Sequence, residues 1–255
     1  FDDDLALDLD AARDLARWLV DQGADGLVLA GTTGEAPTLR DDETLDLFRA
    51  VREAVTVPLV AGTGSFDTAH AIELSRAAAD TGVDGLLLVC PYYSKPSQAG
   101  IEAHFRALGA ATGLPFLVYD IPGRTGRKIH TDVLLRLAHE VPTMVGVKDA
   151  SGDPGETARL IAEAPDGFDL YSGDDALTLP LLAVGASGVI GVAAHWSADE
   201  HARMISAFSK GDVDEARSIN ARLLESYAYE VHDETPQAVC TKAMLRVLGL
   251  AVGQC

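Results

Sequence analysis

The stretch TGVDGLLLV, Thr81 to Val89, decides the fold. It follows an amphipathic helical stretch, and after Thr81 it has a glycine, two further residues, a second glycine and an apolar run. The first glycine suits a helix C-cap with positive φ, the second suits close approach at a strand entry, and the apolar run suits a strand buried on both faces. QGADGLVLA from Gln22 and VGASGVIGV from Val184 repeat the pattern. We interpret all three segments as helix-to-strand junctions.

Three more strands are marked by a proline at their start, where a missing backbone N–H does least harm. They begin at VPLVAGTG from Val57, LPFLVYD from Leu114 and VPTMVGVKD from Val141. With FDLYSGDD from Phe168, the sequence predicts strands near residues 26–30, 58–62, 85–90, 115–119, 144–148, 168–172 and 188–192. Helical patterns separate most of them, which indicates parallel βα units.

Seven such strands fit either an open doubly wound sheet or a barrel with one strand missing. The sequence begins without an initiating Met, so we favour an α/β fold of the (β/α)8 TIM barrel type whose first strand lies outside the sequence. After Ser197 three helices are expected at 198–209, 212–229 and 237–248, with HDETPQ (232–237) as a hinge. We therefore expect a catalytic barrel over 1–196 and a C-terminal helical extension over 197–255.

Composition limits the classes of partner. The net charge of −19 argues against binding of nucleic acid or an anionic membrane, which both require clustered Lys and Arg. No apolar run approaches the roughly 20 residues of a membrane-spanning helix, and FDDDLALDLD has no features of a signal peptide. The cysteines at 90, 240 and 255 form no CxxC pair, which favours a reducing compartment. We expect a cytoplasmic protein.

Ligand sites of parallel α/β folds lie at the carboxyl ends of the strands. The first such end here is GTTGE, residues 31–35, where flanking glycines expose the amides of Thr32 and Thr33. Amides and hydroxyls in this arrangement suit a carboxylate or phosphate, although a plain turn or helix cap has the same pattern. Arg124 follows another strand in PGRTG, where it either is solvated or binds a carboxylate with its guanidinium fork.

Lys148 ends the apolar run of MVGVKDAS, and only five lysines occur in the chain. A lysine there either reaches water or is kept neutral by apolar surroundings. A neutral amine attacks a ketone or aldehyde to form a Schiff base, whose iminium makes the neighbouring carbon acidic. That chemistry needs a proton carrier, and Tyr119 ends the preceding strand, although a tyrosine there also suits simple packing. Thr32 and Thr33 suit the carboxylate of a 2-keto acid.

Acidic residues offer a competing hypothesis. Asp149, Asp174 and Asp175 have oxygen ligands of the kind that Mg²⁺ prefers, but we favour hydrogen-bonding or helix-capping roles for them. His195 follows a strand without an HxH or HxxxE partner, so it does not support a metal site.

Taken together, the motifs GTTGE, PYYSKPSQAGIEAHF, YDIPGRTG and VGVKDASGD resemble the pyruvate-dependent class I aldolase family of dihydrodipicolinate synthase and N-acetylneuraminate lyase. The resemblance runs from Phe1 to about Gly253. It implies a (β/α)8 barrel, a tetramer built from two tight dimers, and a covalent pyruvate imine in place of any separate cofactor.

Residue by residue, the resemblance implies that Lys148 forms the imine and that Tyr119 relays protons. It implies that Thr32 links this relay to Tyr93, which in the family crosses the dimer interface into the partner's site. The amides of Thr32 and Thr33 would hold the pyruvate carboxylate, and the main chain at Ile190 would border the pyruvate.

Within the family, Arg124 matches the arginine that the synthases use for the carboxylate of aspartate semialdehyde, and GTTGE points the same way. The resemblance therefore favours condensation of pyruvate with aspartate 4-semialdehyde. The rivals are an aldolase or dehydratase acting on a sialic acid or a 2-keto-3-deoxy sugar acid, a non-catalytic barrel that binds a small acid, and a metal-dependent barrel enzyme.

Two departures from the family pattern matter. Asp120 stands where the family usually has Asn and adds negative charge near a site for two anionic substrates. Tyr92 fits the family's lysine effector pocket, but Ala36, Phe66 and His70 stand where feedback-sensitive members tend to carry polar or acidic residues. We therefore expect weak or no inhibition by lysine.

Overall fold

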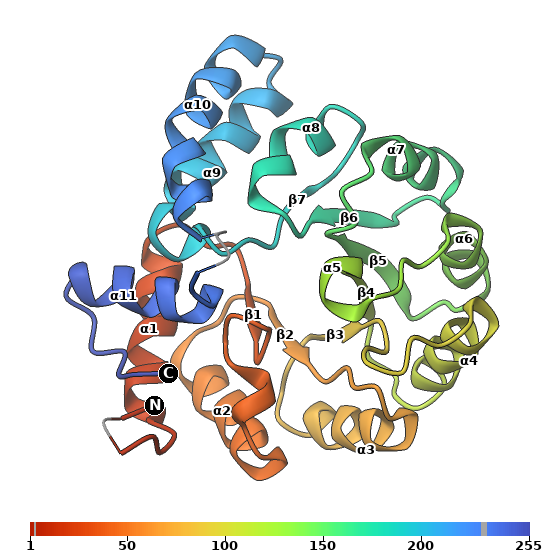
Figure 1. Cartoon of the computed structure of the whole chain (residues 1–255), viewed down its shortest axis with the longest axis horizontal. Coiled ribbons are helices and arrows are strands. Elements are labelled where there is room, and N and C mark those ends of the chain that lie inside the picture. The colour runs from red at the N-terminus through yellow and green to blue at the C-terminus, as the bar shows by residue number, and fades with distance from the viewer. Residues whose placement is uncertain (3, 231–233) are drawn as a thin grey trace. The chain divides into compact units, whose positions relative to one another are not determined.

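Figure 1 shows a computed structural model of the chain, in which residues 1–2, 4–230 and 234–255 are described. The chain forms two compact units. Unit 1 comprises Phe1–Leu59 and Gly191–Cys255, and unit 2 comprises Val60–Ile190. Part of the predicted hinge, 232–237, lies outside the described residues.

Unit 2 alternates strands and helices along the chain. Its strands are β3 (Gly85–Val89), β4 (Phe116–Asp120), β5 (Met144–Asp149), β6 (Asp169–Ser172) and β7 (Gly188–Val189), and β2 (Leu59–Gly62) begins at its border with unit 1. Its helices are α3 (Thr68–Ala79), α4 (Gln98–Gly109), α5 (Pro122–Thr125), α6 (Thr131–Glu140), α7 (Pro154–Glu163), η2 (Asp175–Leu177) and α8 (Thr178–Leu182).

The strands β2 to β7 pair in parallel, each with the next in the sequence. A doubly wound sheet would reverse its strand order at a switch point, whereas a barrel adds each new strand on the same side of the last. The order in unit 2 never reverses, which is the strand order of a barrel and not that of a doubly wound sheet. All five residues of β4 are buried, as are the first four of β3, because helices such as α3 and α4 cover the outside of the sheet (Figure 1).

The glycines at the helix-to-strand junctions behave as the sequence predicts. Gly23, Gly82 and Gly185 have φ of +99°, +84° and +107°. A Cβ on Gly85 would lie 3.1 Å from the carbonyl oxygen of Pro115, the residue before β4, and one on Gly26 would lie 3.1 Å from that of Pro58, the residue before β2. The second glycine of the pattern therefore does allow close approach of two backbones.

Unit 1 contains α1 (Leu9–Asp21), β1 (Leu27–Leu29), η1 (Ala36–Thr38), α2 (Asp41–Ala54), α9 (Ala194–Ser209), α10 (Val213–Glu230) and α11 (Gln237–Val247). The amide of Leu27 donates to the carbonyl of Pro58 at 3.0 Å, so β1 begins beside the residue that precedes β2. The sheet order is therefore β1 to β7 in sequence. Helices α9, α10 and α11 pack on one another, which confirms the three C-terminal helices. Ser197 interrupts α9 with non-helical φ and ψ, close to the expected start at 198.

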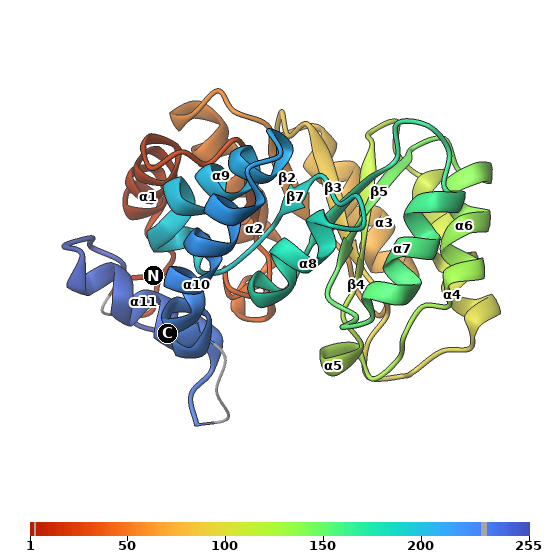
Figure 2. The ribbon, with the colours of Figure 1, turned by 90° about the horizontal axis from the view of Figure 1, so that it is seen from above.

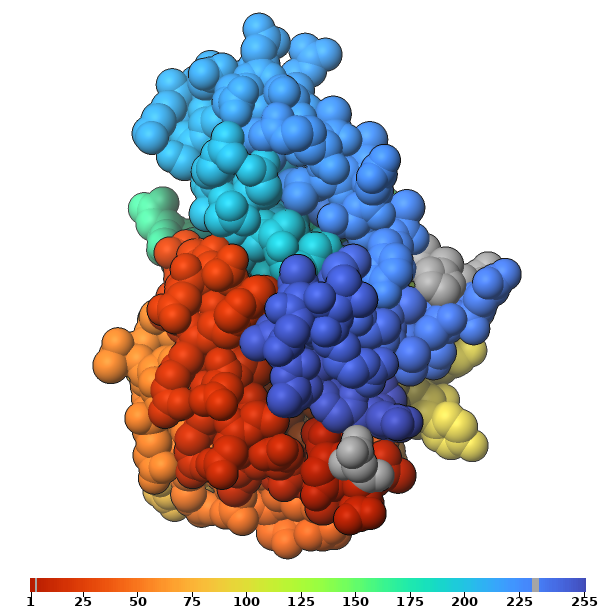
Figure 3. All heavy atoms as spheres, turned by 90° about the vertical axis from the view of Figure 1, so that its left-hand side faces the viewer, coloured from red at the N-terminus to blue at the C-terminus, as the bar shows by residue number. Residues whose placement is uncertain are grey.

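The last residues of the chain lie against its first helix in unit 1 (Figure 3). Gly249–Val252 and residues of α1 such as Ala11 and Leu15 line a hollow of about 250 Å³. Lys242 pairs with Glu35 at 2.6 Å and lies 4.9 Å from the centre of the Phe1 ring. Within the described residues, none of the helices combines the length and the apolar character that a bilayer span needs.

Candidate active site

Two of the residues singled out in the sequence meet at the carboxyl ends of β4 and β5. Tyr119 and Lys148 are register partners in these neighbouring strands. The Nζ atom of Lys148 lies 4.4 Å from the centre of the Tyr119 ring, so both side chains project from the same face of the sheet. The structure therefore brings the lysine and the tyrosine singled out in the sequence into contact within unit 2.

Tyr119 is held in its protonated form. Burial raises the pKa of its phenol to about 12, and Arg124 opposes this shift while Asp174 adds to it. Burial disfavours the phenolate because the anion loses its hydration. At neutral pH the hydroxyl therefore keeps its proton and can donate a hydrogen bond to a neighbouring oxygen.

The aliphatic part of Lys148 passes over Gly173, which follows β6. A Cβ at Gly173 would lie 3.0 Å from Cγ and 3.1 Å from Cε of Lys148, and 3.1 Å from Cβ of Ala150. The amide of Gly173 donates to the carbonyl of Asp149 at 2.7 Å, which fixes the two chains at this spacing. The absence of a side chain at Gly173 thus leaves the path along which Lys148 extends.

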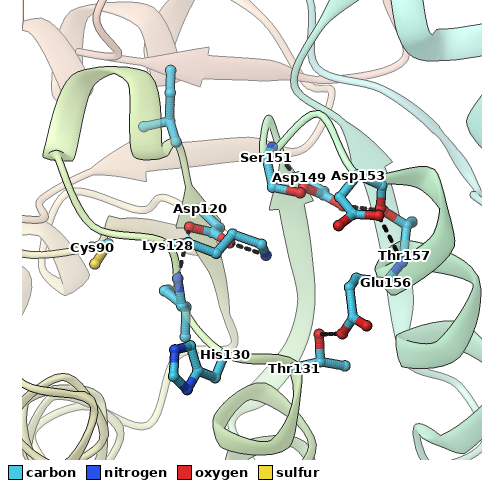
Figure 4. Close-up of polar contacts among 12 residues, drawn as sticks. Cys90, Asp120, Lys128, His130, Thr131, Asp149, Ser151, Asp153, Glu156 and Thr157 are labelled. Carbon is cyan, nitrogen blue, oxygen red and sulfur yellow. Dashed lines mark hydrogen bonds and ion pairs between the residues drawn. The ribbon is translucent and has the colours of Figure 1, made fainter.

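The residues that follow Tyr119 and Lys148 in β4 and β5 are Asp120 and Asp149, which carry carboxylates (Figure 4). Asp149 accepts hydrogen bonds from the amide of Ser151 at 2.8 Å and from the hydroxyl of Thr157 at 2.5 Å. Asp174 caps the turn η2 by accepting from the amide of Ala176 at 3.0 Å. These are the structural roles that we favoured over metal binding. In residues 1–2, 4–230 and 234–255 there is no group of three or more His, Cys, Asp or Glu side chains suited to a metal ion.

Asp120 is buried, and its charge is compensated. The ammonium group of Lys128 lies 2.6 Å from Oδ2, and the amide of Ile129 donates to Oδ1 at 3.3 Å. Burial raises the pKa of the Asp120 carboxyl, while Lys128 and the amide of Ile129 lower it. The extra negative charge that the sequence indicated near the site is therefore paired with a cation in the same loop.

Arg124 lies in α5, a single turn beyond the end of β4 and apart from the helices that flank the sheet (Figure 2). Its amide donates to the carbonyl of Ile121 at 3.0 Å, and its side chain is exposed. Its charge acts on the Tyr119 phenol, where it opposes the rise in pKa. Arg124 therefore stands at the same end of β4 as the tyrosine.

Tyr93 is the most exposed large hydrophobic residue described, with 90% of its surface accessible. Its φ of +66° is in the left-handed region, which is unusual for a residue other than glycine, asparagine or aspartate. In this chain the hydroxyl is thus directed away from the protein's own core rather than buried within it.

The remaining predicted residues lie on strand-end turns. Ile190 follows β7, and its amide donates to the carbonyl of Ser172 at 2.9 Å. Thr32 and Thr33 form part of the turn after β1 in unit 1, between Ala30 and Glu35, whose φ values are +48° and +56°. Among the described residues, no acceptor takes a hydrogen bond from the amide of Thr32 or Thr33.

All 255 residues match the model of the dihydrodipicolinate synthetase family. The chain belongs to this family. A family relative from Corynebacterium aurimucosum, named 4-hydroxy-tetrahydrodipicolinate synthase, is 52% identical, and the match covers 100% of this chain and 83% of the relative. The dihydrodipicolinate synthase structure from Bacillus anthracis has a TM-score of 0.96 at 39% identity, and the match covers 100% of this chain and 87% of the chain in that structure. The enzyme from Acinetobacter baumannii, solved in complex with pyruvate, has a TM-score of 0.91 at 35% identity, with 97% and 84% covered.

Membership of the dihydrodipicolinate synthetase family confirms the resemblance drawn from the four motifs, and the likeness to its solved structures confirms the TIM-barrel fold with C-terminal helices. Sequence reasoning missed three residues of the site. Gly173 and Tyr171, a register neighbour of Lys148, lie in FDLYSGDD, where we considered only a strand and the two aspartates that follow it. The third residue, Lys128, pairs with Asp120 at the end of β4. In the sequence the two residues are eight positions apart, and this spacing does not by itself predict that they form an ion pair.

Proposed function

We propose that this protein is a lyase that condenses pyruvate with aspartate 4-semialdehyde to 4-hydroxy-tetrahydrodipicolinate, a step of lysine and diaminopimelate biosynthesis. The observation that carries the proposal is the relative of that name, which is 52% identical over the whole of this chain. The contact between Lys148 and Tyr119 supports it independently, because an amine beside a protonated phenol suits imine chemistry.

In the proposed reaction, the Lys148 amine attacks the C2 carbonyl of pyruvate, and loss of water gives an imine. Loss of a proton from C3 converts the imine into an enamine, because the iminium accepts the electron pair. The enamine carbon attacks the aldehyde carbon of the semialdehyde, and the new alkoxide takes up a proton. The amino group of the former semialdehyde then attacks C2, which closes the ring and releases Lys148. The imine is the only covalent carrier, so the scheme needs no separate cofactor.

Tyr119 supplies the proton that turns the hydroxyl of the first adduct into water. Its raised pKa supports the role, since the phenol holds its proton until a stronger base is beside it. By resemblance to the family, Thr32 connects Tyr119 to Tyr93 of the partner subunit. The exposure and left-handed φ of Tyr93 support a side chain that serves another protomer, and we propose a homotetramer built as a dimer of dimers.

Substrate carboxylates have separate holders in this proposal. The amides of Thr32 and Thr33 bind the carboxylate of pyruvate, and the main chain at Ile190 borders it. Arg124 binds the carboxylate of aspartate semialdehyde. We further propose that residues 1–196 are the catalytic barrel and 197–255 its helical extension. The protein acts in the cytoplasm on small molecules, with neither nucleic acid nor membrane as partner.

The test is turnover of aspartate semialdehyde in the presence of pyruvate, followed by an assay coupled to reduction of the product. The proposal requires product formation that depends on both substrates. Absence of turnover with semialdehyde, together with release of pyruvate from a sialic acid or a 2-keto-3-deoxy sugar acid, would assign the protein to another activity on this fold.

A further inference from the structure

The loop that carries Arg124 leaves the sheet at Asp120 and returns to the same residue. The chain runs from the end of β4 through α5 to Lys128 and Ile129, and both of these bind the Asp120 carboxylate. The Lys128 ammonium binds Oδ2 at 2.6 Å and the Ile129 amide binds Oδ1 at 3.3 Å. A single buried carboxylate thus closes the base of this loop (Figure 4).

A neighbouring segment fixes the returning half of the loop. The side-chain amide of Gln98 donates to the carbonyl of Lys128 at 2.8 Å, and its oxygen accepts from the amide of His130 at 2.9 Å. The guanidinium of Arg127 donates to the carbonyl of Lys95 at 3.0 Å. These contacts hold the end of the loop, and the remainder of the loop is the short excursion that contains Arg124.

Within that excursion, Thr125 is buried and its hydroxyl lies within hydrogen-bond distance of the carbonyls of Ile121, at 3.1 Å, and Arg127, at 3.0 Å. Thr125, the residue next to Arg124, therefore links the outgoing and the returning half of the loop by hydrogen bonds. The turn that carries Arg124 is thus compact and hydrogen-bonded to both halves of the loop.

The two partners of the ion pair differ in their exposure to solvent. The side chain of Asp120 is 1% exposed, whereas that of Lys128 is 32% exposed. If Asp120 becomes neutral, Lys128 can be hydrated by water. If Lys128 is removed, an ionised carboxylate stays buried without its cation, which is far more costly. The loop therefore depends more on Lys128 than on the charge of Asp120.

We propose that Asp120 and Lys128 are positioning residues that hold Arg124 in place for the carboxylate of the second substrate, and that they act on specificity without touching either substrate. The inference rests on the proposed function, in which Arg124 binds aspartate semialdehyde. It concerns the second substrate, because Lys148 and Tyr119 lie in β5 and β4 themselves and their positions are set by these strands.

The test compares Lys128→Met, Asp120→Asn and the double variant. Lys128→Met should raise KM for the semialdehyde about tenfold, since displacement of a positioning group by a fraction of an ångström has effects of this order. KM for pyruvate and the rate of borohydride-trapped imine formation should stay within about twofold. Asp120→Asn should change the semialdehyde KM by no more than about threefold, because its amide oxygen still accepts from Ile129. The double variant should recover most of the loss seen with Lys128→Met, because no unpaired charge is left buried.

A matched control is Arg159→Met, which breaks the exposed pair with Asp132 at 2.6 Å and should leave both KM values unchanged. Amide hydrogen exchange of residues 121–129 gives a readout independent of turnover. Exchange there should be faster in Lys128→Met than in the wild type and return toward the wild-type rate in the double variant.

The inference is overturned if exchange at 121–129 is the same in Lys128→Met and wild type, or if the KM values for both substrates rise together. Failure of the proposed function looks different, because the wild type itself would then form no product from the semialdehyde. In that case the exchange measurement still decides whether Asp120 and Lys128 hold the loop.

Discussion

Gly173→Ala tests whether Lys148 works from the position seen in the structure. The added methyl would lie 3.0 Å from Cγ of Lys148, against the 3.4 Å at which ordinary contact begins, a shortfall of about 0.4 Å. Rotation of Gly173 itself gives no relief, because Cβ of Ala150 lies 3.1 Å away and the Gly173 amide is bonded to Asp149. Lys148 must therefore move.

The displacement grows along the side chain. Cγ is one bond from Cβ whereas Nζ is four bonds from it, so a torsion that moves Cγ by about 0.4 Å moves the amine by about 1 Å, at a rotamer cost of about 1 kcal/mol. Misplacement of a reacting group by about 1 Å costs on the order of 100-fold in rate, equivalent to about 2.7 kcal/mol of activation free energy. The fold should survive, because overpacking costs about 1–3 kcal/mol and the loss of glycine's freedom in the unfolded chain returns about 0.4–1 kcal/mol.

The assay is the rate of borohydride-trapped imine formation with saturating pyruvate, alongside thermal unfolding. Gly113→Ala is the control, since nothing lies within 4 Å of a Cβ at Gly113 and its φ is not positive. We expect a fall of about 100-fold for Gly173→Ala and less than about twofold for Gly113→Ala. Equal rates in the two folded variants would refute the reasoning, because the amine would then not depend on the path over Gly173.

Three further predictions follow from the structure. Tyr119→Phe should lower kcat by about 10²- to 10⁴-fold, and a Phe variant with wild-type kcat would remove Tyr119 from the proposed relay. Because the pKa of Tyr119 is about 12, the wild-type pH profile of kcat/KM should show no decline from this phenol below about pH 11. Burial lowers the pKa of His104 to about 4, so the contribution of its neutral form to stability is complete above about pH 6.5. As the pH falls from about 6.5 to about 4, the free energy of unfolding of the wild type should fall by at most about 3 kcal/mol more than that of His104→Gln. Parallel curves of stability against pH for the two proteins would contradict this prediction. Lysine should inhibit weakly or not at all, because Phe66 packs edge-on against Tyr92 with ring centres 5.2 Å apart and offers no charge to an ammonium group; clear inhibition by submillimolar lysine would show this to be wrong.

The parallel units and the pairing of Lys148 with Tyr119 could be predicted because they depend on local signals. Glycines at 23, 82 and 185 mark strand entries by backbone conformation, and parallel strands bring their carboxyl ends to one edge. The contacts of Gly173 and the closure of a loop on Asp120 could not be predicted in the same way. These contacts join residues that come close only because of the conformation of the turn or loop between them. Neither the spacing of the residues nor the hydrophobic pattern predicts that conformation.

The charge of Asp120 illustrates the same limit. The sequence shows an acid where the family usually has an amide, and by itself this indicates repulsion of anionic substrates. In the structure Asp120 pairs with Lys128, so the negative charge of Asp120 is compensated within one loop. Compensation of this kind becomes visible only when the position of both side chains is known.

The most direct measurement is covalent. The protein is incubated with pyruvate, reduced with borohydride, digested, and examined for the peptide that gains the mass of a reduced pyruvate adduct. The proposed mechanism predicts a single adduct on Lys148, absent in Lys148→Met and absent without pyruvate. An adduct on another lysine, or none in an enzyme that turns over both substrates, would contradict the assignment of Lys148 as the imine-forming residue.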